Sequence, residues 1–161
     1  YSRQGKVQTV SVRPSNVYGP VLTDAFNRWS LVPGCFCREA MGAGTITIKS
    51  SGKQTRNFIH LENLSRAVES IIKRFPDKYE CYNLASSRCL MMTEVAEITR
   101  QVYEKEFQKP VQVNIEGTEP AEPNRFSINL TKLQSTGFLE DENSTLQAAI
   151  SDIFKYLNSK K

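Results

Sequence analysis

The sequence predicts an α/β fold, in which strands and helices alternate along the chain. Short segments rich in β-branched residues, such as 7–12 and 45–49, are typical of strands. A longer segment at 64–75 has apolar residues that recur every three or four positions, which is typical of a helix with one buried face. The alternation of these two patterns predicts a sheet covered by helices, and 161 residues suffice for one core.

The first strand and the first helix are separated by an irregular segment. Residues 7–12 read V-Q-T-V-S-V, and the strand is expected to end at Arg13 and Pro14 because proline cannot donate a hydrogen bond to a neighbouring strand. A short helix is expected from about Pro33, since proline is tolerated in the first helical turn. Gly42 is available to terminate this helix.

The middle of the chain is expected to contain a hairpin-like pair of strands and then the clearest helix. Residues 45–49 alternate as T-I-T-I-K, and a turn at 50–52 leads to a second short strand at 57–61. The helix that follows has its apolar face over 64–75, with Asn63 as the candidate N-cap.

The last part of the chain repeats the alternation of strand and helix. The expected elements are a strand at 81–85, a helix from Thr93, a strand at 111–115, a polar loop at 116–124 and a final helix from about Ser144.

Charge and hydropathy argue against two classes of partner. The net charge of +4 comes from 21 Lys and Arg against 17 Asp and Glu without a dense basic run, so nucleic acid is not an expected partner. No apolar run approaches the ~20 residues of a membrane helix, so no membrane span is expected. The first residues lack the apolar core of a secretory signal, and the cytoplasm is therefore the expected location.

The cysteines do not predict a metal site. Cys35, Cys37, Cys81 and Cys89 show no C-x-x-C pair, although a set completed by His60 is conceivable. Scattered cysteines in a chain of this size pack as small hydrophobes more often than they bind metal. We expect free thiols and no metal.

Two stretches carry the chemistry of the sequence. Residues 13–20 read R-P-S-N-V-Y-G-P, and residues 51–60 read S-G-K-Q-T-R-N-F-I-H. The guanidinium of Arg56 is a planar fork of donors that stays charged and matches phosphate oxygens. These stretches resemble motifs of the second half of the NAD-dependent nucleotide-sugar epimerases and dehydratases, the extended short-chain dehydrogenase/reductase family.

The resemblance implies both a fold and a division of the chain. Residues 1–24 would be the last part of a Rossmann-type parallel sheet domain, and residues 25–161 would form a smaller mixed α/β lobe that binds the substrate. The expected ligand is a nucleotide-diphosphate sugar. A full-length family member would also use NAD or NADP.

The resemblance also assigns roles to particular residues. Asn16 would donate its amide to phosphate or sugar oxygens of the substrate, Arg56 would contact the diphosphate, and Pro14 and Ser15 would lie nearer the cofactor. Further substrate contacts are implied for Leu31, Val32, Asn83 and Arg125. No catalytic residue is assigned within the chain.

Several simpler interpretations stand beside these assignments. Asn16 and Gly19 would be turn residues only, Arg56 would be a solvated structural arginine, and the sole histidine, His60, is expected to be structural. Asn57 replaces the aspartate that is usual in the family, so its local network is expected to differ. Around Glu119 the usual R-P-G-D wording is absent, which weakens the assignment of Arg125.

The catalytic parts of the family are missing from this sequence. It has no G-x-x-G-x-x-G loop, and its only Tyr-x-x-x-Lys spacing, Tyr156 to Lys160, falls in the final helix and tail. The chain alone is therefore expected to be inactive and not to bind the cofactor by itself. The open side of strand 7–12 predicts a partner, either a missing N-terminal half or another copy. The alternative is a stand-alone, non-catalytic module for nucleotide-sugar binding or protein association.

Overall fold

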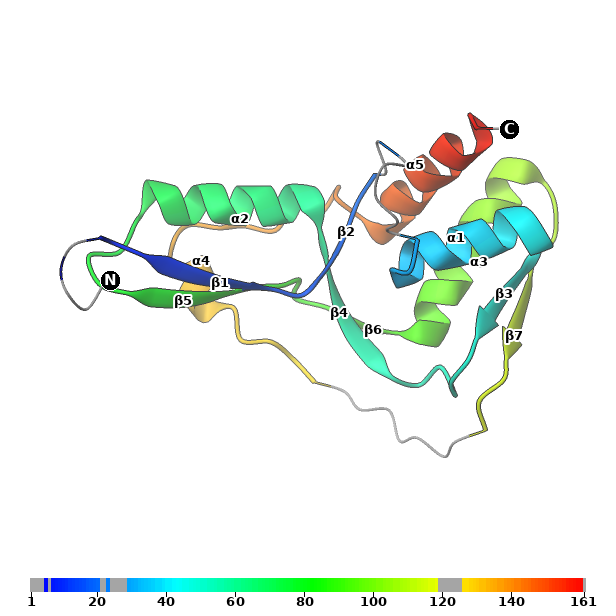
Figure 1. Ribbon diagram of the computed structural model, residues 1–161, viewed down its shortest axis with the longest axis horizontal. Coiled ribbons are helices and arrows are strands. Elements are labelled where there is room, and N and C mark those ends of the chain that lie inside the picture. Colours follow the sequence, from blue (N-terminus) through cyan, green and yellow to red (C-terminus); the bar gives the residue numbers. More distant parts are fainter. Residues whose placement is uncertain (1–4, 6, 21–22, 24–28, 119–125, 161) are drawn as a thin grey trace.

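The structure is a computed structural model, and it describes residues 5, 7–20, 23, 29–118 and 126–160. The described part is elongated, with two groups of elements at opposite ends (Figure 1). One end holds a pair of strands accompanied by two helices. These elements are β1 Val10–Pro14, β5 Glu80–Leu84, α2 Leu61–Lys73 and α4 Thr131–Gln134.

The other end holds three helices that pack on one another and on a second pair of strands (Figure 1). These elements are α1 Val32–Ala43, α3 Met92–Phe107, α5 Leu146–Asn158, β3 Thr45–Ile48 and β7 Gln112–Ile115. Three further strands connect the two ends: β2 Asn16–Tyr18, β4 Thr55–His60 and β6 Cys89–Met91. The molecule is thus mixed α/β with parallel strand pairs, as the sequence predicts.

Pairing of the strands is mostly parallel. β1 pairs with β5, β2 with β4 and β3 with β7 in parallel, while β4 pairs with β6 antiparallel. The predicted hairpin of the strands at 45–49 and 57–61 is therefore wrong. The chain after β3 docks on the start of α3 instead, where Thr93 N donates to Gly52 O and Met92 N donates to Gln54 O, both at 3.2 Å.

The larger core lies between α1, α3, α5 and the β3–β7 pair. Its aromatic centre is formed by Tyr103, Phe107 and Phe154, whose ring centroids lie 4.8 to 5.7 Å apart. The smaller core lies between α2 and the β1–β5 pair and contains Ile71 and Leu84. Strand β4 contributes Phe58 to the larger core and the next residue, Ile59, to the smaller one.

The smaller core draws on both parts of the chain that the sequence divides at residue 24. Val10 and Val17 pack against the cluster of buried residues that contains Ala67 and Leu133. The division into 1–24 and 25–161 remains a prediction, because packing within one cluster does not define a domain boundary.

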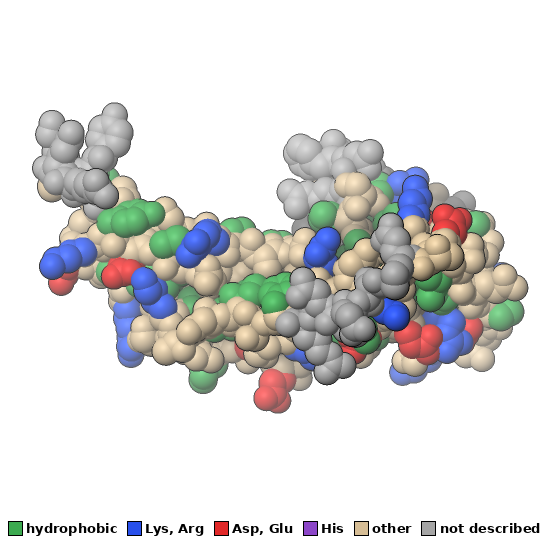
Figure 2. Space-filling model, turned by 90° about the horizontal axis from the view of Figure 1, so that it is seen from below, with side chains coloured by type: hydrophobic (Ala, Val, Ile, Leu, Met, Phe, Trp, Pro, Cys, Tyr) green, Lys and Arg blue, Asp and Glu red, His purple; other side chains and the backbone are tan. Residues whose placement is uncertain are grey.

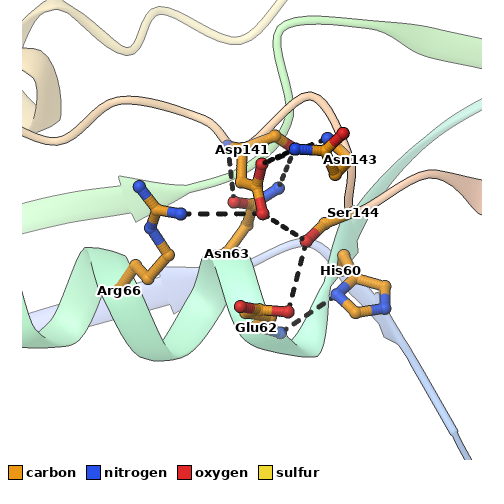
Figure 3. Close-up of polar contacts among 7 residues, drawn as sticks. All are labelled: His60, Glu62, Asn63, Arg66, Asp141, Asn143 and Ser144. Atoms are coloured by element: carbon orange, nitrogen blue, oxygen red, sulfur yellow. Dashed lines mark hydrogen bonds and ion pairs between the residues drawn. The ribbon is translucent and has the colours of Figure 1, made fainter.

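Helix boundaries differ from the predicted ones at two places. α1 ends at Ala43, and the residue that terminates it is Gly44, which takes the left-handed conformation with φ 66°, and not Gly42. α2 begins after His60, which caps it, and not after Asn63. Asn63 is 1% exposed and lies inside the helix, where its amide accepts from Asp141 N at 2.8 Å and donates to Asp141 O at 3.3 Å (Figure 3).

The first strand also differs from its prediction. β1 runs from Val10 to Pro14, so Pro14 is the last residue of the strand and not the first residue after it. The next residue still bonds to β5, because Ser15 N donates to Leu84 O at 2.9 Å. The sequence patterns did not predict the short elements β2, β6 and α4. The remaining predicted helices and strands are confirmed within a few residues: α3, α5, β5 and β7. None of the described helices combines the length and the apolarity needed to cross a membrane.

Candidate functional site

A cavity of about 160 Å³ lies between β2, β4 and the start of α1. Four residues that the sequence assigns to substrate binding meet here: Asn16, Leu31, Val32 and Arg56. The other lining residues are Val17, Ser30, Pro33 and Phe58. We call this space the Arg56 cavity.

Strand pairing places Asn16 and Arg56 on the same side. Asn16 is registered against Phe58 in the parallel β2–β4 pair. Alternate residues of a strand point to the same face, so Arg56 and Phe58 share the side of β4 that faces the cavity. Residues 40 positions apart in the sequence therefore reach one space.

The charge of Arg56 is available in this cavity. Its side chain is exposed, and Nη1 donates only a long bond of 3.4 Å to Thr55 O. Among the described residues, no carboxylate forms an ion pair with it. A free guanidinium at the mouth of a cavity attracts anions, phosphate groups above all.

The start of α1 adds to this positive character. Ser30, Leu31, Val32 and Pro33 line the cavity, so the first turn of a 12-residue helix borders it. The first N–H groups of a helix lack partners within the helix, and its dipole is positive at this end. The helix pattern predicted the helix itself but gave no signal that its N-terminus would face Arg56.

Asn16 is held in place by the neighbouring strand. Its Nδ2 donates to Asn57 O at 2.8 Å, which leaves the second amide proton and Oδ1 for other partners. The residue lies in β2 and not in a turn. Gly19 also needs no turn conformation; a side chain there would lie 2.9 Å from Leu61 Cβ, so glycine is required for close packing.

Asn57 fixes the loop that joins β5 to β6. The side chain is 2% exposed, and its Nδ2 donates to Ser86 O at 2.8 Å and to Arg88 O at 3.2 Å, while Oδ1 accepts from Ser86 N at 3.0 Å. Two carbonyl acceptors need a donor, which an aspartate carboxylate does not supply. The residue that departs from the family pattern thus suits its own surroundings.

A second cavity of about 360 Å³ opens at the carboxyl ends of β1 and β5. It is lined by Arg13, Pro14, Ser15, Asn83, Ser127, Ile128 and Asn129. The structure therefore separates Asn83 from the Arg56 cavity and places it with the two residues assigned to the cofactor. Ser15 Oγ is buried here without a hydrogen-bond partner among the described residues. Arg125 lies outside the described residues.

A third cavity of about 510 Å³ lies beside Tyr18, Phe58 and the start of α5. Tyr18 donates its hydroxyl to Ser144 O at 3.3 Å. Burial, and secondarily the charge of Glu140, raises the pKa of Tyr18 to about 12, so its hydroxyl stays protonated at neutral pH. The sequence analysis does not single out this space, because its walls come from five separate stretches of the chain.

His60 has a structural position at the start of α2. Its Nδ1 accepts from Glu62 N at 3.2 Å, and its ring meets that of Tyr18 edge-on at 5.3 Å between centroids. Burial lowers the pKa of His60, with smaller opposing effects of Glu62, Asp152 and Asp141. The ring is thus a neutral cap of the helix.

Two surface properties bear on other ligands. Lysine and arginine side chains are scattered over the face seen in Figure 2, and they do not gather there into one basic patch. Within the described ranges, no three His, Cys, Asp or Glu side chains come together as metal ligands.

A family model identifies the relatives of this chain. The model of the NAD dependent epimerase/dehydratase family matches residues 1–85, which is more than half of the sequence. The chain belongs to the NAD dependent epimerase/dehydratase family. The resemblance drawn from the motifs at 13–20 and 51–60 is therefore confirmed.

Curated members of the epimerase/dehydratase family are similar over most of this chain. A dTDP-4-dehydro-6-deoxy-D-allose reductase of Streptomyces bikiniensis is 28% identical over 122 residues, which are 76% of this chain and 35% of that protein. A second reductase of the same name, from a Streptomyces species, is 24% identical over 93% of this chain and 43% of its own length. The chain thus spans less than half the length of these two relatives.

Solved structures confirm the fold class. The UDP-glucuronic acid 4-epimerase of Bacillus cereus, in complex with UDP-glucuronic acid and NAD, matches 100% of this chain and 48% of its own, with a TM-score of 0.75 and 17% identity. The UDP-N-acetylglucosamine 4-epimerase of Methanobrevibacter ruminantium M1, in complex with UDP-N-acetylmuramic acid, has a TM-score of 0.72 and 18% identity over 94% of this chain and 46% of its own. At such identity the likeness shows the Rossmann-like fold alone.

Proposed function

We propose that this chain is the substrate-binding part of an NAD(P)-dependent nucleotide-sugar epimerase or dehydratase. The observation that carries the proposal is the Arg56 cavity. One unpaired guanidinium, one asparagine amide and one helix N-terminus border the same space. A diphosphate has the charge and the acceptor oxygens to bind all three.

The other walls of the Arg56 cavity suit the base and the sugar of such a ligand. Leu31, which is 43% exposed, and Val32 offer an apolar surface beside the charged group. Such a surface suits the flat face of a nucleotide base, and the amide of Asn16 suits a sugar hydroxyl or phosphate oxygen. The names of the relatives support this ligand class, because they are enzymes of UDP- and dTDP-sugars.

The cofactor would meet this chain only at Pro14 and Ser15. The buried Oγ of Ser15, which has no partner among the described residues, leaves an open hydrogen-bonding position in the second cavity. A dinucleotide's phosphates need a glycine-rich loop at the start of a helix, and no such loop is present in the sequence. When bound to the whole enzyme, NAD or NADP accepts and returns a hydride. This chain's part is to hold and orient the substrate.

Titration with a nucleotide sugar tests the proposal. We expect UDP-glucuronic acid or a dTDP-hexose to bind the chain in calorimetric or NMR titrations, and Arg56→Ala to weaken binding at least about tenfold, because one charge-assisted hydrogen bond contributes about 1.5–3 kcal/mol. Arg88→Ala is the matched control, since Arg88 is an exposed arginine outside the Arg56 cavity and pairs with Glu94 at 3.5 Å.

Equal losses in the two variants would contradict the proposal, because the effect would then be one of general charge. If wild-type protein bound no nucleotide sugar, the alternative of a protein-association module would replace it. Binding by this chain, together with no turnover by the polypeptide of the complete reading frame when NAD is added, would leave the non-catalytic, nucleotide-sugar-binding module.

A further inference from the structure

The third cavity lies on the same face of the central strands as the Arg56 cavity. Arg56 is registered against Leu90 in the antiparallel β4–β6 pair, and residues that oppose one another across two strands share a face. Phe58 is two residues from Arg56 and shares that face too. Phe58 lines both cavities, so its ring stands between them. The diphosphate proposed for the Arg56 cavity leaves the third cavity unused.

The size of the third cavity suits a small molecule. Its volume is about 510 Å³, and small-molecule sites usually measure ~300–1,000 Å³. Such sites combine an apolar wall with a few polar groups that fix the orientation of the ligand. The third cavity has both kinds of wall.

The apolar wall contains an aromatic ring whose orientation is fixed. Tyr18 meets Phe58 edge-on, with ring centroids 6.5 Å apart, and its hydroxyl is held by Ser144 O. Leu90 and Leu146 are buried beside these rings. An aromatic ring held in this way offers a flat apolar surface. The carbon-bound hydrogens on one side of a pyranose ring form a surface of matching shape.

The polar wall offers mainly hydrogen-bond acceptors. Glu140 Oε2 accepts from Ser87 N at 3.1 Å, and a carboxylate has further acceptor positions beyond one such bond. Ser86 Oγ accepts from Arg88 N at 3.2 Å and remains able to donate. Gln147, in the first turn of α5, adds an amide that can accept and donate. A ligand with several hydroxyl groups can satisfy this wall.

The loop that carries Glu140 is held in place before any ligand binds. Asn63 holds the backbone N–H and C=O of Asp141, and the carboxylate of Asp141 lies 3.6 Å from Arg66 Nη1 (Figure 3). Ser144 Oγ donates to the same carboxylate at 3.2 Å. A wall that is already ordered costs little conformational entropy when a ligand binds. The carboxylate of Asp141 is engaged by these partners.

The charge of the third cavity excludes an anionic ligand. Glu140, Asp141 and Glu142 all contribute to its lining. The cation of the lining is Arg88, whose side chain is 74% exposed and lies 3.5 Å from Glu94. A diphosphate would be repelled by the three carboxylates. The third cavity therefore does not suit a nucleotide sugar.

We propose that the third cavity binds the ring of an unphosphorylated sugar, with one face of the ring on Tyr18 and its hydroxyl groups bonded to Glu140 and Gln147. This site goes beyond the proposed function, because none of its polar groups belongs to the Arg56 cavity. The chain thus has one site for a sugar that carries a diphosphate and another for a sugar without one.

NMR titration tests the site with the methyl glycosides of glucose, galactose and mannose as probes. At least one of them should shift the backbone amide signals of Ser87 and Gln147 at tens of millimolar sugar. Gln147→Ala should weaken this binding about threefold, the effect of one neutral hydrogen bond. Ser87→Trp should abolish it by filling the cavity. Ser65→Trp is the matched control, since Ser65 is an exposed serine of α2 outside the cavity.

Three outcomes would overturn the proposal. The first is that none of the glycosides shifts these signals. The second is equal loss of binding in Ser87→Trp and Ser65→Trp. The third is binding of glucosamine without binding of any neutral glycoside, because attraction of an amine to carboxylates would then explain the effect.

Arg56→Ala separates this site from the proposed function. The variant should bind the methyl glycosides as wild-type protein does, and loss of their binding would place the sugar in the Arg56 cavity and overturn the second site. If nucleotide sugars failed to bind wild-type protein while the glycosides did bind, the proposed function would be rejected and the site in the third cavity would stand.

Discussion

At the scale of single residues, hydrogen-bond polarity decides which side chain a position accepts. Asn57 shows this, because its amide nitrogen faces the carbonyls of Ser86 and Arg88 in a site closed to water. A carboxylate there would set oxygen against oxygen at the same distances. A protein with aspartate at this position would therefore need a β5–β6 loop that presents donors, where this chain presents the carbonyls of Ser86 and Arg88.

We predict that Asn57→Asp lowers the free energy of unfolding by at least about 2 kcal/mol at neutral pH, since a buried charge is left facing two acceptors. The loss should shrink as pH falls, because protonation turns the carboxyl into a donor. Urea denaturation at several pH values measures it. Asn129→Asp is the control, for Asn129 is exposed and uses its oxygen, which accepts from Thr131 N at 2.9 Å. A similar loss in both variants would contradict this account.

Sequence motifs predicted which residues meet in the Arg56 cavity, and they did so from the order of letters around Asn16 and Arg56. Asn83 lies apart from these residues, in the second cavity, because β5 pairs with β1 and carries Asn83 toward Ser15. Its assignment to the substrate stays a prediction. The motifs also gave no role to the polarity of Asn57. Such details depend on contacts between segments that are distant in sequence.

At the scale of elements, the cap of α2 links helix stability to pH. His60 Nδ1 accepts from Glu62 N only while the ring is neutral. Burial lowers the pKa of His60 in the folded protein, so the unfolded chain takes up a proton first as pH falls. The stabilisation is therefore complete above the ordinary value of about 6.5 and is lost as pH decreases toward the folded value.

We predict that His60→Asn removes this pH dependence, because an asparagine oxygen caps a helix without titrating. The expected result is that wild-type protein loses stability between about pH 7 and pH 5.5 and that the variant loses less. Chemical denaturation across that range measures how the free energy of unfolding changes with pH in each protein. The variant lacks the ring contact with Tyr18 at every pH, so the loss of this contact does not affect the slope. Parallel slopes in the two proteins would show that His60 does not titrate in this range.

Element types were predictable where periodicity was strong, as in α2 and α5, but their partners were not. The apolar residues of α2 belong to two faces, one buried with Ala67 and Ile71 and one exposed with Val68 and Ile72, and a single pattern does not separate them. The strands at 45–49 and 57–61 were expected to pair because they are near in sequence. In the structure β3 pairs with β7, which lies more than 60 residues farther along the sequence. Pairing between such distant strands is set by tertiary packing.

At the scale of the whole molecule, strand β4 couples the two cores. Phe58 and Ile59 are neighbours in the chain, and they point into different clusters because successive side chains of a strand face opposite ways. β4 also pairs with both β2 and β6. If one core is lost, β4 loses its packing on that side and no longer holds its residue in the other core. The two ends of the molecule should therefore unfold together.

We predict that Ile71→Ala and Ile153→Ala each lower the free energy of unfolding by about 2–4 kcal/mol, since both residues are 2% exposed in different cores. Fluorescence of Trp29, the sole tryptophan, reports the larger core, against which it packs. Ile71→Ala removes packing from the smaller core only, yet it should shift the Trp29 transition as far as the far-UV circular dichroism transition. Ile72→Ala, on the exposed side of the same helix, should change either by less than about 0.5 kcal/mol. An unchanged Trp29 midpoint in Ile71→Ala would mean that the two ends unfold independently and that β4 joins them without coupling them.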